Sequence, residues 1–173
     1  MTRGTAVFCI SAGAAIPVLW LTLLATSQVT DLNERAVAYA FHWTAEGLTS
    51  VLLLVSGAAI LIGMARARRL FFLAIGLLGI AALGMCVYYA LRGDVPFAAM
   101  GLMISALTIF FVLKNGMSIR DAVYAICGVT LYVFLTAGGN ALHSGDMLSA
   151  VYLLLACVVV AGFTVARLRG APE

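Results

Sequence analysis

Six long apolar runs, separated by short polar connections, constrain this chain more than any other feature of its sequence. A helix that crosses a bilayer needs roughly 20 mostly apolar residues, and lipid offers the backbone no hydrogen-bond partners, so a spanning run must be helical or part of a closed barrel. The runs are continuous, as in LTSVLLLVSGAAILIG, and not alternating, which argues against a barrel. The predicted spans are Thr5–Ser27, Ala36–Gly63, Leu70–Leu91, Val95–Leu113, Ala122–Leu142 and Met147–Ala166.

The composition points the same way. Of the 173 residues, 64% are hydrophobic and only 10% are charged, whereas a soluble domain carries about 25% charged residues. The connections are too short to form a soluble domain, so we expect residues 1–173 to form one all-α domain, a polytopic membrane bundle of six transmembrane helices. The first apolar run is longer than the roughly 7–15 residues of a signal-peptide core, and we expect it to be retained as a helix.

The basic residues predict how the chain is oriented. Eight of the ten fall on one side of the predicted bundle: Arg3, Arg66, Arg68, Arg69, Lys114, Arg120, Arg167 and Arg169. The opposite side holds the other two and most of the acids: Arg35, Arg92, Asp31, Glu34, Asp94 and Asp146. Because cytoplasmic loops are rich in Lys and Arg, both termini are predicted to be cytoplasmic, in the cell (plasma) membrane. The net charge of +3 is then a signal of topology. We expect the lipid bilayer as a partner and no nucleic acid, and other membrane subunits or self-association stay open.

The segment AFHWTAEG places two polar side chains one helical turn apart near the start of the second span. Glu46 is the only charged side chain well inside a predicted span, and such a residue normally faces a protein interior or a wet cavity and has a partner. Residues four apart share a helix face, so His42 is the expected partner, and Thr49 extends that face. The fifth span runs outward and brings Asn140 and His143 to the same side. These five residues form the predicted ligand or proton site; a buried network that only fixes helix packing is the alternative.

The segment FHWTAE, followed by VYYALRGDVPFAAMGLM, resembles a pattern in small multi-span membrane proteins of uncharacterised function. In that group a Phe-His-x-x-Ala-Glu helix precedes a Tyr-rich helix end, a Gly-Asp turn and another span. The likeness covers about half of the chain, from Ala36 to Lys114. It implies that His42 and Glu46 belong together, and it carries no known activity.

The leading hypothesis is a small integral membrane protein that binds or passes a proton, an ion or a small solute, alone or as a subunit of a larger complex. Glu46 would be the protonation or cation site, and His42 would modulate its charge. No catalytic residue is predicted, and this role is favoured over an enzyme. A retinal pump is excluded because the only lysine, Lys114, lies at a helix end.

Three alternatives stay open, and none of them makes a cofactor the favoured expectation. The first is an electron-transfer subunit that holds haem b between His42 and His143. The second is a metal-dependent membrane enzyme with zinc or another divalent ion on His42, Glu46 and His143, joined by Asp146. The third is a structural or assembly subunit. The four cysteines lie within spans and lack the CxxC spacing of a zinc or redox motif.

Overall fold

The computed structural model describes residues 1–27 and 32–170, and these fold into helices without a strand. Asp31, assigned above to the first connection, lies outside the described residues. The helices are α1 (Arg3–Ala25), α2 (Ala36–Leu61), α3 (Ala67–Leu91), α4 (Val95–Asn115), α5 (Ile119–His143) and α6 (Met147–Gly170). All six are long and apolar enough to cross a membrane. The prediction of an all-α, six-helix, multi-pass membrane protein is therefore confirmed.

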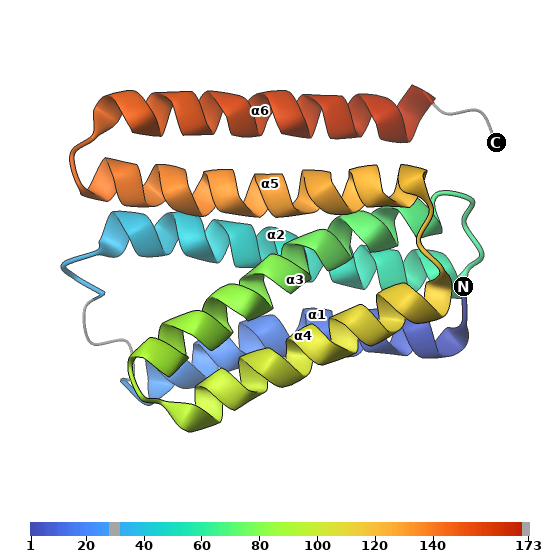
Figure 1. Ribbon diagram of the computed structural model, residues 1–173, viewed down its shortest axis with the longest axis horizontal. Helices are drawn as coiled ribbons and strands as arrows, with labels where there is room; N and C mark the ends of the chain where they lie inside the picture. The colour runs from blue at the N-terminus through green and yellow to red at the C-terminus, as the bar shows by residue number, and fades with distance from the viewer. Residues whose placement is uncertain (28–31, 171–173) are drawn as a thin grey trace.

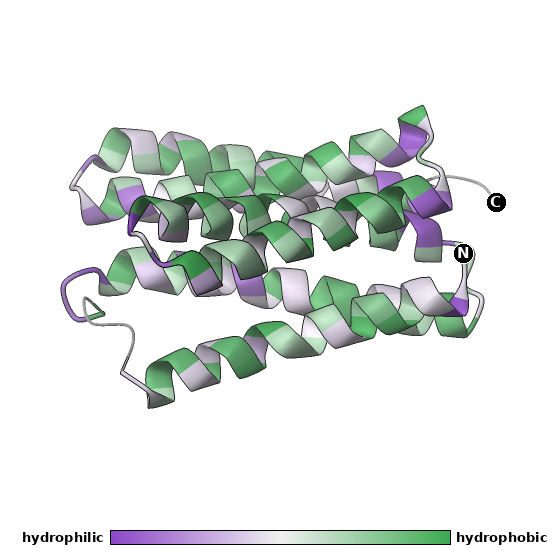
Figure 2. Cartoon of the chain, turned by 60° about the horizontal axis from the view of Figure 1, so that its bottom comes forward, coloured by the Kyte–Doolittle hydropathy of each residue, from purple (hydrophilic) through white to green (hydrophobic). Residues whose placement is uncertain are grey.

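The helices run alternately up and down. α1 begins and α6 ends at one end of the bundle, and α2, α4 and α6 begin at the opposite end (Figure 1). We call that opposite end the distal end. Hydrophobic residues cover the length of the helices and polar residues gather at both ends (Figure 2), as expected for a chain surrounded by lipid.

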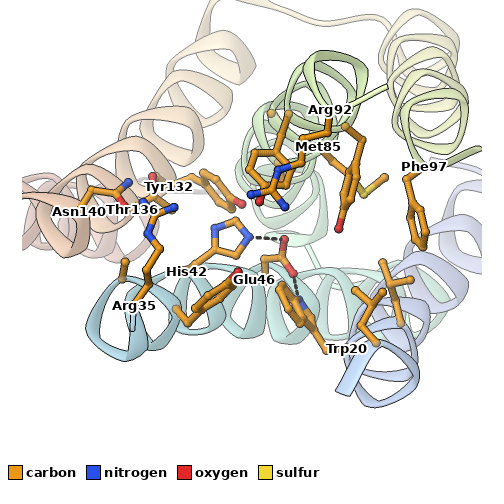
Figure 3. Close-up of a pocket in the computed structure, with 18 residues that line it drawn as sticks. Trp20, Arg35, His42, Glu46, Met85, Arg92, Phe97, Tyr132, Thr136 and Asn140 are labelled. Carbon is orange, nitrogen blue, oxygen red and sulfur yellow. Dashed lines mark hydrogen bonds and ion pairs between the residues drawn. The ribbon is translucent and has the colours of Figure 1, made fainter. Parts of the chain in front are cut away.

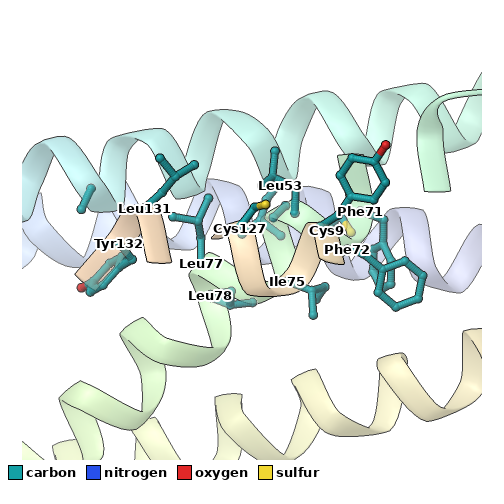
Figure 4. Close-up of a cluster of buried hydrophobic side chains, with 14 of the residues drawn as sticks. Cys9, Leu53, Phe71, Phe72, Ile75, Leu77, Leu78, Cys127, Leu131 and Tyr132 are labelled. Atoms are coloured by element: carbon teal, nitrogen blue, oxygen red, sulfur yellow. The ribbon is translucent and has the colours of Figure 1, made fainter. Parts of the chain in front are cut away.

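Helix α3 lies at the centre and packs against α2, α4 and α5, while α6 packs mainly on α5. Half of the most apolar stretch of α3 is buried, against 17% for α1, α4 and α6. The apolar core lies between α2, α3 and α5 and includes Leu53, Phe72, Leu77 and Leu131 (Figure 4).

Glycines bring α3 and α5 into close contact. A Cβ atom added at Gly76 would overlap the carbonyl oxygen of Ala125, and one added at Gly128 would overlap that of Leu73. Small residues let helix backbones approach in membranes, where packing replaces the hydrophobic effect as the main attraction. This crossing sets the position of α5 relative to the other helices.

An ion pair closes the end opposite to the distal end. The Arg68 guanidinium binds the buried Asp121 carboxylate, with Nη2 2.7 Å from Oδ2, and donates to the carbonyl of Asn115. Asp121 also completes a capping box with Ser118 at the start of α5. Arg68 lies in the first turn of α3, which begins at Ala67 and not at the predicted Leu70, because the helix continues beyond its apolar stretch into this polar cluster.

Candidate functional site

A cavity of about 450 Å³ lies in the distal half of the bundle. α1, α2, α3 and α5 form its walls, and Phe97 of α4 contributes one side chain. Its volume falls within the roughly 300–1,000 Å³ of typical small-molecule sites. The exposed Arg92 and Asn140 are part of the lining, so the cavity communicates with the surroundings.

The Glu46 carboxylate lies at the centre of this cavity (Figure 3). The indole N–H of Trp20 donates to Oε2, and His42 Nε2 lies 3.2 Å from Oε1. The hydroxyl of Tyr132 also interacts with the carboxylate. The Glu46 side chain is 18% exposed. Three helices thus supply polar partners to one partly buried acid.

Local helix geometry and one helix contact explain this arrangement. His42 and Glu46 are four residues apart on α2 and therefore share a face. α1 packs along α2 in the opposite direction, which brings Trp20 alongside that face. The Trp20 ring meets the His42 ring edge to face at 5.8 Å between centroids, and the Trp43 ring at 5.6 Å.

Aromatic rings make up much of the remaining wall. Tyr89 stacks on Phe97 with 4.8 Å between ring centroids, and Tyr88 meets Tyr89 edge to face at 5.1 Å. On the α5 side, Tyr132 meets the His42 ring at 6.0 Å. The faces of such rings carry negative electrostatic potential and attract cations.

Helix α5 presents Tyr132, Thr136 and Asn140 to the cavity. These residues are spaced four apart, which places them on one face of the helix. Gly139 lets α5 approach α2, because a Cβ atom there would overlap Phe41. This contact holds Tyr132 against His42.

Two arginines lie where the cavity opens at the distal end. Arg35 is the N-cap residue of α2 and Arg92 the C-cap residue of α3, and both line the cavity. Figure 3 shows their side chains extending into it from different helices. The Arg92 guanidinium lies 4.3 Å from the centroid of the Tyr88 ring. The cavity therefore combines one acid, Glu46, with two guanidinium groups.

The structure brings together three of the five residues predicted for the site, namely His42, Glu46 and Asn140. Thr49 does not line the cavity. It lies one turn deeper, lines a separate void of about 50 Å³ that also borders Glu46, and its hydroxyl donates to its own helix at the Ala45 carbonyl.

His143 also lies outside the cavity: it is exposed and does not line it. Gly139 meets Phe41 where α2 and α5 run antiparallel. The residue one turn after Gly139 on α5 therefore lies level with the first residues of α2. His143, the last residue of α5, consequently lies at the end of the bundle.

The predicted metal set is not assembled either. Among residues 1–27 and 32–170, no three His, Cys, Asp or Glu side chains lie close enough to hold a metal ion. His42 and His143 do not share the cavity, so the pair of haem ligands considered as one alternative does not meet there. Sequence reasoning also missed Trp20, Tyr132, Arg35 and Arg92 as cavity residues; the four-residue spacing of Tyr132, Thr136 and Asn140 is the signal that points to the α5 wall.

The comparisons with known proteins concern mainly the first four helices. The family model for a domain of unknown function, DUF8058, matches residues 1–124. This range contains Trp20, His42, Glu46 and Arg92, while Tyr132 and Asn140 lie beyond it. No curated protein and no solved structure matches the chain. Because the match covers well over half of its residues, the chain belongs to the DUF8058 family.

Proposed function

We propose that this protein binds a small solute in the distal cavity, with Glu46 as the principal binding group. The observation that carries the proposal is a partly buried carboxylate in a ligand-sized cavity that has several aromatic rings in its wall. A carboxylate within a membrane span is costly to insert, and a packing role alone needs no cavity beside it.

We further propose that the cavity opens to the outside of the cell membrane, with both termini cytoplasmic. The excess of basic residues at the end opposite to the distal end supports this orientation. A solute would then enter from the external side, past Arg35 and Arg92.

Binding is favoured over passage through the bundle. On the inner side of Glu46 the bundle is filled by buried apolar side chains, among them Leu53, Leu77, Leu78 and Leu131. The buried hydroxyls on this side are bonded within the protein, Thr49 to the Ala45 carbonyl and Ser56 to the Cys9 sulfur, which favours a closed inner end over a path for ions.

The test replaces Glu46 with Gln, which keeps the shape and removes the charge. The purified variant and wild type are screened by thermal shift against small cations, zwitterions, anions and neutral solutes in an uncharged detergent. We expect at least one class to stabilise wild type and to lose its effect on Glu46→Gln. Glu34→Gln, an exposed acid of the same end, is the matched control. A solute that stabilises wild type and Glu46→Gln equally, or the absence of any stabilising class, would refute the proposal.

A further inference from the structure

We infer that the solute is an organic zwitterion, bound with its ammonium group against Glu46 and its anionic group against Arg92. This inference rests on the proposed function and adds the chemical class of the ligand. The presence of both kinds of charge in one cavity carries the inference.

The part of the cavity around Glu46 suits an ammonium group. The Glu46 carboxylate is the one acid among the described residues that line the cavity, and its charge attracts a cation. The surrounding rings of Tyr39, Tyr89 and Tyr132 add the aromatic faces that recognise organic cations in proteins.

The outer part suits an anionic group. Guanidinium groups bind carboxylates and phosphates through paired hydrogen bonds, and Arg92 brings one to the opening of the cavity. Arg92 is held against the Tyr88 ring, which restricts its side chain near the rim.

Neither a simple cation nor a simple anion uses both parts. A simple cation would have to pass two positively charged guanidinium groups, which repel it. A simple anion would be repelled by the negatively charged Glu46 carboxylate. The Arg92 guanidinium and the Glu46 carboxylate line the same cavity, so a compact molecule that carries both charges suits this lining better than either ion alone. The apolar Leu19, Leu23 and Met85 line the cavity as well and suit the carbon chain between the two charges.

Such a zwitterion has two sources, a free solute or the headgroup of a zwitterionic phospholipid. Both present the same ammonium and anionic groups to the cavity. Binding of a soluble zwitterion is therefore measured first, and retention of a phospholipid second.

The full-length protein in an uncharged maltoside detergent is titrated by calorimetry with phosphocholine, choline and ethyl phosphate. The last two carry the cationic and the anionic half of the first. We expect phosphocholine to bind at least about tenfold more tightly than either half. Glu46→Gln and Arg92→Gln should each weaken phosphocholine binding about tenfold, and Arg92→Gln should leave choline binding unchanged. Glu34→Gln and Arg66→Gln remove the same charges outside the cavity and serve as controls. If Glu46→Gln fails to fold, Glu46→Asp takes its place, because it keeps the charge and shortens the side chain.

The outcomes separate this inference from the proposed function. If choline binds as tightly as phosphocholine and depends on Glu46, the cavity is a cation site: the proposed function stands and the zwitterion inference is wrong. If ethyl phosphate binds as tightly as phosphocholine, or Glu46→Gln has no effect, the zwitterion inference and the role of Glu46 are both wrong.

The source is tested in nanodiscs that contain phosphatidylcholine and phosphatidylglycerol in equal amounts. One retained phosphatidylcholine per chain in native mass spectrometry, lost in Glu46→Gln, identifies a lipid headgroup. Phosphocholine binding without a retained lipid identifies a free solute. If neither phosphocholine nor phosphatidylcholine binds, the zwitterion inference is overturned.

Discussion

The hydroxyl of Ser50 donates a 2.6 Å hydrogen bond to the carbonyl oxygen of Gly13, the carbonyl that Pro17 leaves without its helical partner. Proline has no backbone N–H and cannot bond to the residue four positions earlier. An unpaired carbonyl in a membrane costs several kcal/mol, and Ser50 of α2 removes that cost. Pro17 lies less than one turn before Trp20, so this junction helps to set the direction in which Trp20 approaches Glu46.

Ser50→Ala should lower the stability of the protein by about 1–3 kcal/mol, because it leaves the buried Gly13 carbonyl unpaired. The measurement is unfolding in detergent, with the exposed Ser11→Ala as control. In a Pro17→Ala background the helix can supply its own donor, so the cost of Ser50→Ala should fall. An equal cost in both backgrounds would show that the bond to Gly13 is not the reason.

Glu46→Gln should change the fluorescence of Trp20 more than that of Trp43, because only Trp20 donates to the carboxylate. The chain has two tryptophans, so Trp43→Phe and Trp20→Phe each leave a single reporter. We expect Glu46→Gln to shift the emission spectrum in the Trp43→Phe background, and to leave it nearly unchanged in the Trp20→Phe background. Equal shifts in the two backgrounds would contradict the Trp20–Glu46 contact.

Gly128→Ala should destabilise the protein by about 1–3 kcal/mol or more, since its new methyl group would overlap the Leu73 carbonyl where α3 and α5 cross. Gly162→Ala is the matched control, because, among the described residues, no side chain and no other helix lies within 4 Å of a Cβ at that position of α6. Alanine favours a helix over glycine by up to about 1 kcal/mol, so the control should keep or raise the unfolding temperature. A similar response of the two variants would place the tight crossing elsewhere.

The two histidines should differ in their effect on binding. His42 contacts Glu46 inside the cavity, whereas His143 is exposed at the end of α5. His42→Ala should therefore weaken phosphocholine binding about tenfold, because it removes the contact by which His42 positions the charged Glu46 carboxylate. His143→Ala should leave binding unchanged. Calorimetry on both variants is the check, and a comparable loss in His143→Ala would return this residue to the site.

Labelling of single cysteines tests the orientation. In a background with the four native cysteines replaced by alanine, His143→Cys should react with a membrane-impermeant maleimide on intact cells. Lys114→Cys, exposed at the opposite end, should react only after permeabilisation. The reverse pattern would place the cavity opening in the cytoplasm.

The sequence by itself determined that the chain spans a membrane as six helices and that His42 and Glu46 share a face. Both follow from local properties: the length of each apolar run, and the four-residue spacing on α2. The extra turn of α3 at Ala67 and the exact limits of the other helices depended on polar contacts such as Arg68 with Asp121, which hydropathy alone does not reveal.

The tertiary structure decided which side chains meet Glu46. It added Trp20, Tyr132 and Arg92 to the site and left Thr49 and His143 out of the cavity. In lipid, both the buried and the exposed faces of a helix are apolar, so hydrophobicity says little about which face turns inward. Rotation and depth are set instead by close backbone contacts, such as Gly128 against Leu73 and Gly139 against Phe41, and these exist only once the helices have packed together.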